Sequence, residues 1–297
     1  MAAPTGILAA ASGSAATVAP SISNAASAVT PVLYHVPITG KQVLSLALPH
    51  GVRHTSDVQS ANWAGYADSG TAAGASDTYS YVAAQWTEPT VTCPKTGGIL
   101  GLGGSYKAAY SSFWVGLDGY TSSSVEQTGT DADCATTGAG NYYAWYEMYP
   151  AGSVTLPSSD LVRPGDVMKA LVQYDPPGSA ANSYDLAIQD VTRGWFFAIP
   201  ETEAGLARSS AEFVAEAPSQ CSFIFCHELP LAHFSPVTFT NATATDGNGT
   251  AGPIDAFQND DMAMVDNGTT LATTSGLSDN TSTKPASSSF TVTWNAS

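Results

Sequence analysis

The chain has 297 residues, of which 9 are Lys or Arg and 25 are Asp or Glu, giving a formal charge of −16. Nine basic residues cannot form the clustered phosphate-binding surface that nucleic acid requires, and an acidic protein is repelled by anionic membrane surfaces. With 43% hydrophobic residues, the chain is too apolar for a disordered acidic tail and long enough to bury a large core.

The scarcity of basic residues also suits a protein that works in acid. In strong acid most carboxylates are protonated, so that only 9 Lys and Arg and 5 His carry charge and repel one another. We therefore expect little acid unfolding by self-repulsion.

The N-terminal region differs in composition from the rest of the chain. Residues 1–31 are rich in Ala, Ser and Thr and lack a basic start, which fits either a truncated signal segment or a disordered leader. Residues 1–53 contain Lys41 and Arg53 but no acidic residue. We predict a leader or propeptide over 1–56 and a domain over 57–297, with the mature start between about His54 and Asn62. No apolar run reaches the roughly 18 residues of a membrane-spanning helix.

From Asn62 onward the pattern predicts strands. Short runs rich in Val, Tyr, Phe, Trp and Thr alternate with Gly, Pro, Asn and Asp turns, and no stretch has helical periodicity. The predicted strands include Tyr79–Thr87, Phe113–Leu117, Tyr142–Tyr149, Val167–Tyr174, Tyr184–Val191, Val237–Thr240 and Ser289–Trp294. We expect a single all-β domain, built as an antiparallel sandwich or barrel.

The 4 cysteines are Cys93, Cys134, Cys221 and Cys226. An even number without a C-x-x-C pair favours disulfides over zinc, and we favour the pairs Cys93–Cys134 and Cys221–Cys226 among those possible. Sequons at Asn241, Asn248, Asn267, Asn280 and Asn295 fit an extracellular surface, although a bacterial source would leave them unglycosylated.

Several common catalytic motifs are absent. There is no G-x-S-x-G serine elbow, and Pro230 between His227 and His233 prevents the two imidazoles from sharing a helical face as zinc ligands. Asp68-Ser69-Gly70 has no second copy, whereas an aspartic peptidase needs two carboxylates that share a proton. We expect no metal and no organic cofactor.

Six strings occur in order between Asn62 and the C-terminus. They are Asn62-Trp63-Ala64-Gly65, Trp114-Val115-Gly116-Leu117-Asp118-Gly119, Gln127-Thr128-Gly129, Ala144-Trp145-Tyr146-Glu147-Met148-Tyr149-Pro150, Ala211-Glu212-Phe213 and Val237-Thr238-Phe239-Thr240-Asn241-Ala242. Together they resemble the glutamic peptidases, also called family G1 or eqolisins. The resemblance implies a sandwich of two large, curved antiparallel sheets with lectin-like jelly-roll architecture. It also implies a secreted proprotein that cleaves polypeptides in acid, is insensitive to pepstatin and is first covered by its own propeptide.

The resemblance assigns the catalytic roles. Gln127 matches the catalytic glutamine and Glu212 the catalytic glutamate, while Trp114, Asp118 and Glu147 match residues of the active-site cleft. As a carboxylate, Glu212 would take a proton from the attacking water and return it to the leaving amine. The Gln127 amide would donate to the developing oxyanion at every pH. We expect a monomer.

Some positions depart from the family pattern. Fungal members commonly have Trp at the position of Phe213 and an apolar residue at that of Glu126. In a strand, Glu126 and Gln127 point to opposite faces, so Glu126 is not expected in the cleft. The Cys221–Cys226 segment has no counterpart in the pattern. We expect a bacterial member of the family.

Three other interpretations stay open at this point. Aromatic and acidic residues on a curved sheet also suit a lectin-like carbohydrate-binding sandwich. Two carboxyl groups such as Glu147 and Glu212 would suit a glycoside hydrolase. A catalytically inactive relative is the third, although the presence of both Gln127 and Glu212 argues against it.

Overall fold

The structure is a computed structural model that describes residues 32–44, 54–69, 78–95, 97, 104–222, 225–275, 277 and 289–297. All of these residues belong to one unit, Val32–Ser297. Residues 1–31 and 45–53, most of the predicted leader with Arg53, lie outside the described residues.

The first of two sheets carries most of the candidate site residues. Its strands lie side by side in the order β1 (Gln42–Val43), β2 (His54–Ser60), β19 (Asn259–Asp266), β3 (Trp63–Ser69), β13 (Ser210–Glu216), β6 (Ser112–Leu117), β7 (Val125–Cys134), β8 (Gly140–Tyr149) and β9 (Val154–Thr155). The pairing is antiparallel throughout except between β2 and β19. β20 (Thr269–Ser275) and β21 (Phe290–Trp294) continue from β19.

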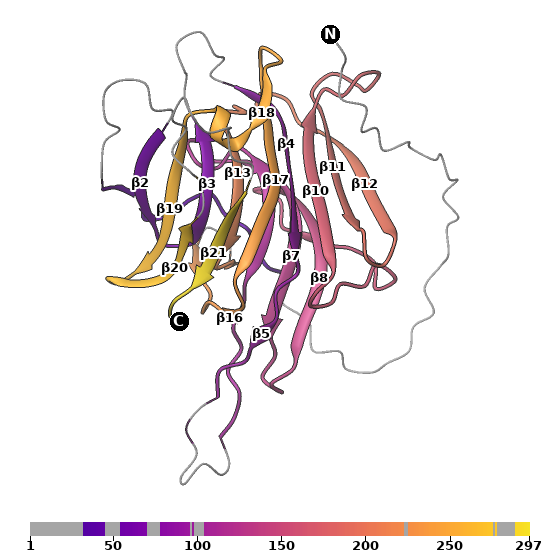
Figure 1. The fold of residues 1–297 in the computed structure, drawn as a ribbon. Coiled ribbons are helices and arrows are strands. Elements are labelled where there is room, and N and C mark those ends of the chain that lie inside the picture. The colour runs from indigo at the N-terminus through magenta and orange to yellow at the C-terminus, as the bar shows by residue number, and fades with distance from the viewer. Residues whose placement is uncertain are drawn as a thin grey trace. The chain divides into compact units, whose positions relative to one another are not determined.

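The second sheet contains the strands β12 (Trp195–Thr202), β11 (Ser183–Asp190), β10 (Val167–Tyr174), β4 (Tyr79–Thr87), β17 (Val237–Asp246) and β18 (Ala251–Pro253). β17 joins the sheets, because its first residues pair with β21 and its later ones with β4 (Figure 1). A 3-10 turn, η2 (Ile254–Ala256), follows β18. Two small two-stranded sheets complete the fold. One is the hairpin of β14 (Ser219–Ser222) and β15 (Phe225–Glu228), and the other pairs β5 (Val91–Thr92) with the distant β16 (His233–Phe234).

The central strands of the first sheet, β3, β13, β6 and β7, are buried on both faces. In β6, Phe113 and Val115 point into a core that also contains Trp86 and Leu186 of the second sheet. Trp114 points the opposite way, into a second apolar cluster with Trp63, Trp145, Val214 and Met262. Two antiparallel sheets over one core, with no α-helix among the described residues, confirm the predicted all-β sandwich. None of those residues form a helix able to span a membrane.

Both predicted disulfides are present. Cys93–Cys134 connects the segment after β5 to the end of β7, and Cys221–Cys226 closes the β14–β15 hairpin. Strand β2 spans the predicted boundary at residues 56/57 and pairs with β1 and β19. The division into leader and domain stays a prediction.

Candidate active site

The register of the first sheet places the predicted catalytic residues in one row. Glu212 on β13 pairs with Gly116 on β6, Gly116 pairs with Gln127 on β7, and Gln127 pairs with Glu147 on β8. Directly paired residues point to the same face of a sheet. This row therefore lies on the face that also carries Trp114, two positions before Gly116.

The indole ring of Trp114 lies between the two members of the predicted pair. A Cβ atom added to Gly116 would be 3.0 Å from Trp114 Cζ3 and 3.1 Å from Gln127 Cβ. The ring thus reaches over Gly116, into the space that separates Gln127 from Glu212.

A second carboxyl group of β13 lies on the same face. Glu216 follows Glu212 by four positions, so the period of the strand turns both side chains to one side. Trp114 Nε1 donates a hydrogen bond to Glu216 Oε2 at 2.8 Å. Glu216 is fully buried.

A peptide bond of the chain itself lies between Gln127 and Glu216. Gln127 Nε2 donates to the carbonyl oxygen of His35 at 2.5 Å. The amide nitrogen of Val36, the next residue, donates to Glu216 Oε1 at 3.1 Å. The two site residues therefore hold opposite ends of one peptide group. This peptide belongs to what we name the N-terminal segment, residues 32–44.

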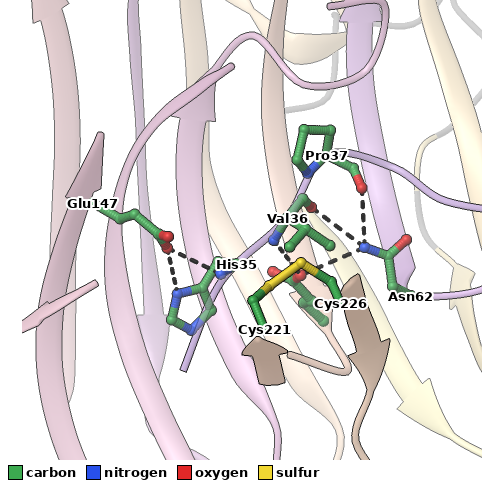
Figure 2. Close-up of a disulfide and its surroundings, with 8 residues drawn as sticks. His35, Val36, Pro37, Asn62, Glu147, Cys221 and Cys226 are labelled. Atoms are coloured by element: carbon green, nitrogen blue, oxygen red, sulfur yellow. Dashed lines mark hydrogen bonds and ion pairs between the residues drawn. A yellow bond between two sulfur atoms is a disulfide. The ribbon is translucent and has the colours of Figure 1, made fainter. Parts of the chain in front are cut away.

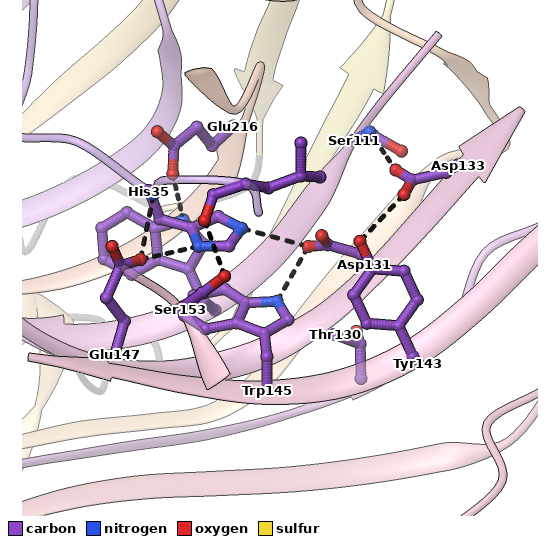
Figure 3. A network of polar contacts seen from close by, with 12 residues as sticks. His35, Ser111, Thr130, Asp131, Asp133, Tyr143, Trp145, Glu147, Ser153 and Glu216 are labelled. Carbon is purple, nitrogen blue, oxygen red and sulfur yellow. Dashed lines mark hydrogen bonds and ion pairs between the residues drawn. The ribbon is translucent and has the colours of Figure 1, made fainter. Parts of the chain in front are cut away.

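The side chain of His35 is enclosed by aromatic and acidic groups. Its ring stacks on Trp145 with 3.6 Å between centroids and an interplanar angle of 1°. Nδ1 lies 2.8 Å from Glu147 Oε2, and Nε2 lies 3.2 Å from Asp131 Oδ1 (Figure 3). Burial opposes the imidazolium charge, but the carboxylates of Asp131 and Glu147 raise the pKa of His35 to about 10. His35 is therefore a cation in acid, with both ring nitrogens donating.

Backbone pairing holds the segment on the N-terminal side of this peptide. Tyr34 N donates to Ser219 O at 2.9 Å, and Ser219 N donates to Tyr34 O at 2.8 Å. Ser219 begins the hairpin that the Cys221–Cys226 disulfide closes, and Figure 2 shows this disulfide with His35 and Val36. The segment is thus joined to the first residue of β14 by an isolated antiparallel β-bridge at Tyr34.

Side-chain and backbone contacts hold the N-terminal segment on the C-terminal side of the His35–Val36 peptide. Asn62 Nδ2 donates to the carbonyl oxygens of Val36 and Pro37, each at 3.3 Å (Figure 2). Ile38 N donates to Gly119 O at 3.1 Å. The segment is therefore held by directional contacts before and after the His35–Val36 peptide.

Burial raises the pKa of every glutamate in this region. It holds the pKa of Glu216 well above the ordinary value, although the positive charge of His35 and the Trp114 hydrogen bond oppose the shift. It also raises the pKa of Glu147, against the hydrogen bonds from His35. Burial and acidic neighbours raise the pKa of Glu212. At Glu216 the His35 cation and the indole N–H oppose the effect of burial, and burial outweighs them.

The remaining predicted residues have different surroundings. Glu147 contacts the site directly, since its Oε2 accepts from His35 N at 3.0 Å. Asp118, at a positive φ of 72°, accepts hydrogen bonds from the backbone of Arg208 and Ser209 and so connects the turn after β6 to the loop before β13. Glu126 is buried and, as expected for a strand, points away from the face that Gln127 occupies.

Sequence reasoning did not single out Asp131, Glu216 or His35. The first two could have been found from the period of two along a strand, since each stands four positions after a predicted catalytic residue. His35 gives no such signal, because it comes from a segment predicted to be a leader.

Comparison with known proteins identifies relatives of this chain. The sequence profile of the Peptidase A4 family matches residues 61–285. The chain is 30% identical to aspergillopepsin-2 of Aspergillus niger over 256 residues, which cover 81% of each protein. It is 32% identical to scytalidopepsin B of Scytalidium lignicola over 163 residues, 52% of this chain and 58% of that protein.

Solved structures resemble the fold. A crystal structure of scytalido-glutamic peptidase with a transition state analog inhibitor matches with a TM-score of 0.61 and 23% identity, over 79% of this chain and 98% of that one. The structure of aspergilloglutamic peptidase from A. niger matches with a TM-score of 0.50 and 30% identity, over 63% and 99%.

Proposed function

The chain belongs to the Peptidase A4 family of glutamic peptidases and is a peptide hydrolase, and from that premise we propose that Gln127 and Glu216 form its catalytic pair. One observation carries the proposal: a peptide group, His35–Val36, lies with its carbonyl oxygen on Gln127 and its amide nitrogen on Glu216. A substrate peptide would occupy the same position.

In this proposal Glu216 moves the proton. As a carboxylate it takes a proton from a water molecule, whose oxygen adds to the scissile carbonyl carbon. When the C–N bond breaks, the same carboxyl group gives that proton to the leaving nitrogen. Its Oε1 lies 3.1 Å from the corresponding nitrogen of Val36, while Trp114 holds Oε2.

Gln127 stabilises the charge that develops. Its Nε2 donates to the carbonyl oxygen, which becomes an oxyanion in the tetrahedral intermediate. An amide keeps this donor at every pH. The pairing of one carboxyl group with one amide also leads us to propose pepstatin insensitivity, because no second carboxyl group shares the proton.

Glu212, which the sequence analysis favoured, is the rival for the role of Glu216. It lies in the same row as Gln127, but the Trp114 ring reaches over the intervening Gly116. We propose that Glu212 acts as a buried, neutral neighbour of the site.

We further propose that the enzyme is secreted, acts on unfolded polypeptides in acid as a monomer, and is made with a propeptide that includes the N-terminal segment. The two disulfides support an oxidising location outside the cell.

The experiment is digestion of a denatured protein between pH 2 and 7 with pepstatin present. We expect Glu216→Gln to lower kcat by about 10²–10⁴ and Gln127→Ala by about 10²–10³. Glu212→Gln should stay within about tenfold of wild type, as loss of a neutral carboxyl group costs no proton transfer. Exposed Glu203→Gln is the matched control.

Two results would contradict the assignment. Loss of activity in Glu212→Gln with activity kept in Glu216→Gln would transfer the catalytic role to Glu212. Full activity in Gln127→Ala would remove the oxyanion role. Thermal unfolding of each variant separates loss of catalysis from loss of fold.

A further inference from the structure

We propose that the chain cuts itself between His35 and Val36. The proposal rests on the proposed function and deepens it, since it names the first substrate of the site as the chain's own N-terminal segment. The new site is a single peptide bond, and its products are a fragment ending at His35 and a chain beginning at Val36.

The first argument is the position of both catalytic groups on one peptide. Gln127 Nε2 is 2.5 Å from the His35 carbonyl oxygen, and Glu216 Oε1 is 3.1 Å from the Val36 nitrogen. These are the atoms on which charge and proton must arrive when this bond is hydrolysed. A substrate held in this way is close to the reacting geometry, which supplies much of an enzyme's rate.

The second argument is that the register of the segment is fixed. Two hydrogen bonds join Tyr34 to Ser219 before the bond, and Asn62 and Gly119 hold the backbone after it. A shift by one residue would break all these contacts and turn each side chain to the opposite side. The peptide between the catalytic groups is therefore His35–Val36 and not a neighbour.

The third argument is the fit of the residue before the bond. The His35 ring stacks on Trp145 and places its two nitrogens on Glu147 and Asp131. Two carboxylates around a flat cation select a protonated imidazole over an apolar side chain. Trp145 Nε1 also donates to Asp131 Oδ1 at 2.8 Å, which fixes that carboxylate against the ring.

The reaction needs only water. Its oxygen adds to the carbonyl carbon of His35 while Glu216 accepts its proton. The C–N bond then breaks, its electron pair stays on the Val36 nitrogen, and Glu216 protonates that nitrogen. The products are the carboxyl group of His35 and the amine of Val36.

The test follows the full-length chain after a shift from neutral pH to pH 4. Intact mass and N-terminal sequencing are recorded over time at two protein concentrations about tenfold apart, with a denatured protein added to parallel samples. We expect a new N-terminus at Val36, a fragment ending at His35, and the same half-time at both concentrations, because the bond is already bound within the molecule.

Variants test whether the effect is specific to the His35–Val36 bond or general to the N-terminal segment. Val36→Pro removes the N–H that contacts Glu216 and should abolish cleavage at this bond. The matched control is Val32→Pro, an exposed position in the same segment, which should be cut at His35 within about twofold of the wild-type rate. Glu216→Gln should stay uncut, and His35→Ala should slow the cut more than tenfold.

The possible failures can be distinguished. If the added protein is degraded while His35–Val36 stays intact, or if the first cut occurs elsewhere, the self-cleavage proposal is wrong and the proposed function stands. A rate that rises with protein concentration also overturns self-cleavage within one molecule. If neither the segment nor the added protein is cut between pH 2 and 7, both proposals fail.

Discussion

Replacing Glu88 with Gln should change how stability depends on pH. Glu88 follows β4 and is 1% exposed. Its Oε2 accepts hydrogen bonds from Thr130 Oγ1 at 2.6 Å and Trp86 Nε1 at 3.4 Å, while Oε1 has no partner among the described residues. Burial raises the pKa of Glu88 from 4.5 to about 8. The folded protein therefore keeps a proton that the unfolded chain loses.

The sign and size of the effect follow from this difference. Below pH 4.5 Glu88 is protonated in both states, so its protonation does not penalise folding. Between there and about pH 8 only the folded state binds the proton, so the free energy of unfolding falls as pH rises. At about 1.4 kcal/mol per pH unit, the loss reaches about 3 kcal/mol at pH 7. Glu88→Gln has no proton to lose and should escape this loss.

Urea unfolding at pH 4.5 and pH 7 measures the effect. Any cost of the new amide at the Oε1 position is present at both pH values and cancels in the comparison. We expect Glu88→Gln to gain about 3 kcal/mol relative to wild type between the two pH values. Exposed Glu203→Gln should gain nothing. An equal difference between Glu88→Gln and wild type at both pH values would refute the reasoning.

Three further changes have expected outcomes. Trp114→Phe removes the hydrogen bond to Glu216 and so raises the pKa of Glu216 further. The acid limb of the pH profile of kcat/KM should therefore move up by about one pH unit. An unmoved limb would argue against Glu216 as the base. Gly129→Ala would place a Cβ 2.5 Å from Trp114 Cβ and should lower stability by about 1–3 kcal/mol or more, visible as a lower Tm. Cys93→Ser opens the Cys93–Cys134 loop, with a sequence separation of 41, and should cost about 4 kcal/mol by urea unfolding; a loss under about 1 kcal/mol would show that the loop is ordered without the bond.

The strands could be predicted where they bury apolar side chains at alternate positions. The predicted ranges Tyr79–Thr87 and Val167–Tyr174 coincide with β4 and β10. The same pattern does not predict β7, Val125–Cys134, because polar residues such as Glu126 and Gln127 are buried on both of its faces. Strands that carry a site depart from the apolar pattern because their side chains serve chemistry instead of the core.

The candidate pair could be predicted only in part. The resemblance assigned Gln127 and Glu212, and our proposal keeps Gln127 but replaces Glu212 by Glu216. The period of β13 places Glu212 and Glu216 on one face and does not distinguish them. The difference lies in tertiary contacts: Trp114 donates to Glu216 and reaches over Gly116 beside Glu212. No local pattern encodes these contacts, since they join β6 to β13.

Family membership decides between the broader alternatives. It excludes the lectin-like and glycoside hydrolase interpretations as the activity of this chain, because its relatives are glutamic peptidases. The bacterial origin stays a prediction.

The part of the N-terminal segment after Val36 would stay attached to the protein after a cut at His35–Val36, and this attachment would affect KM. After Val36, both Pro37 and Thr39 are hydrogen-bonded to Asn62, Lys41 lies over the ring of Tyr120, and β1 is paired with β2. A cut at His35–Val36 would leave this part attached, where a short tether gives an effective concentration of about millimolar. Substrates would have to displace it, so further trimming before β2 would lower KM and leave kcat unchanged. The extent of trimming would then set how much substrate the enzyme needs, while its chemistry would stay the same.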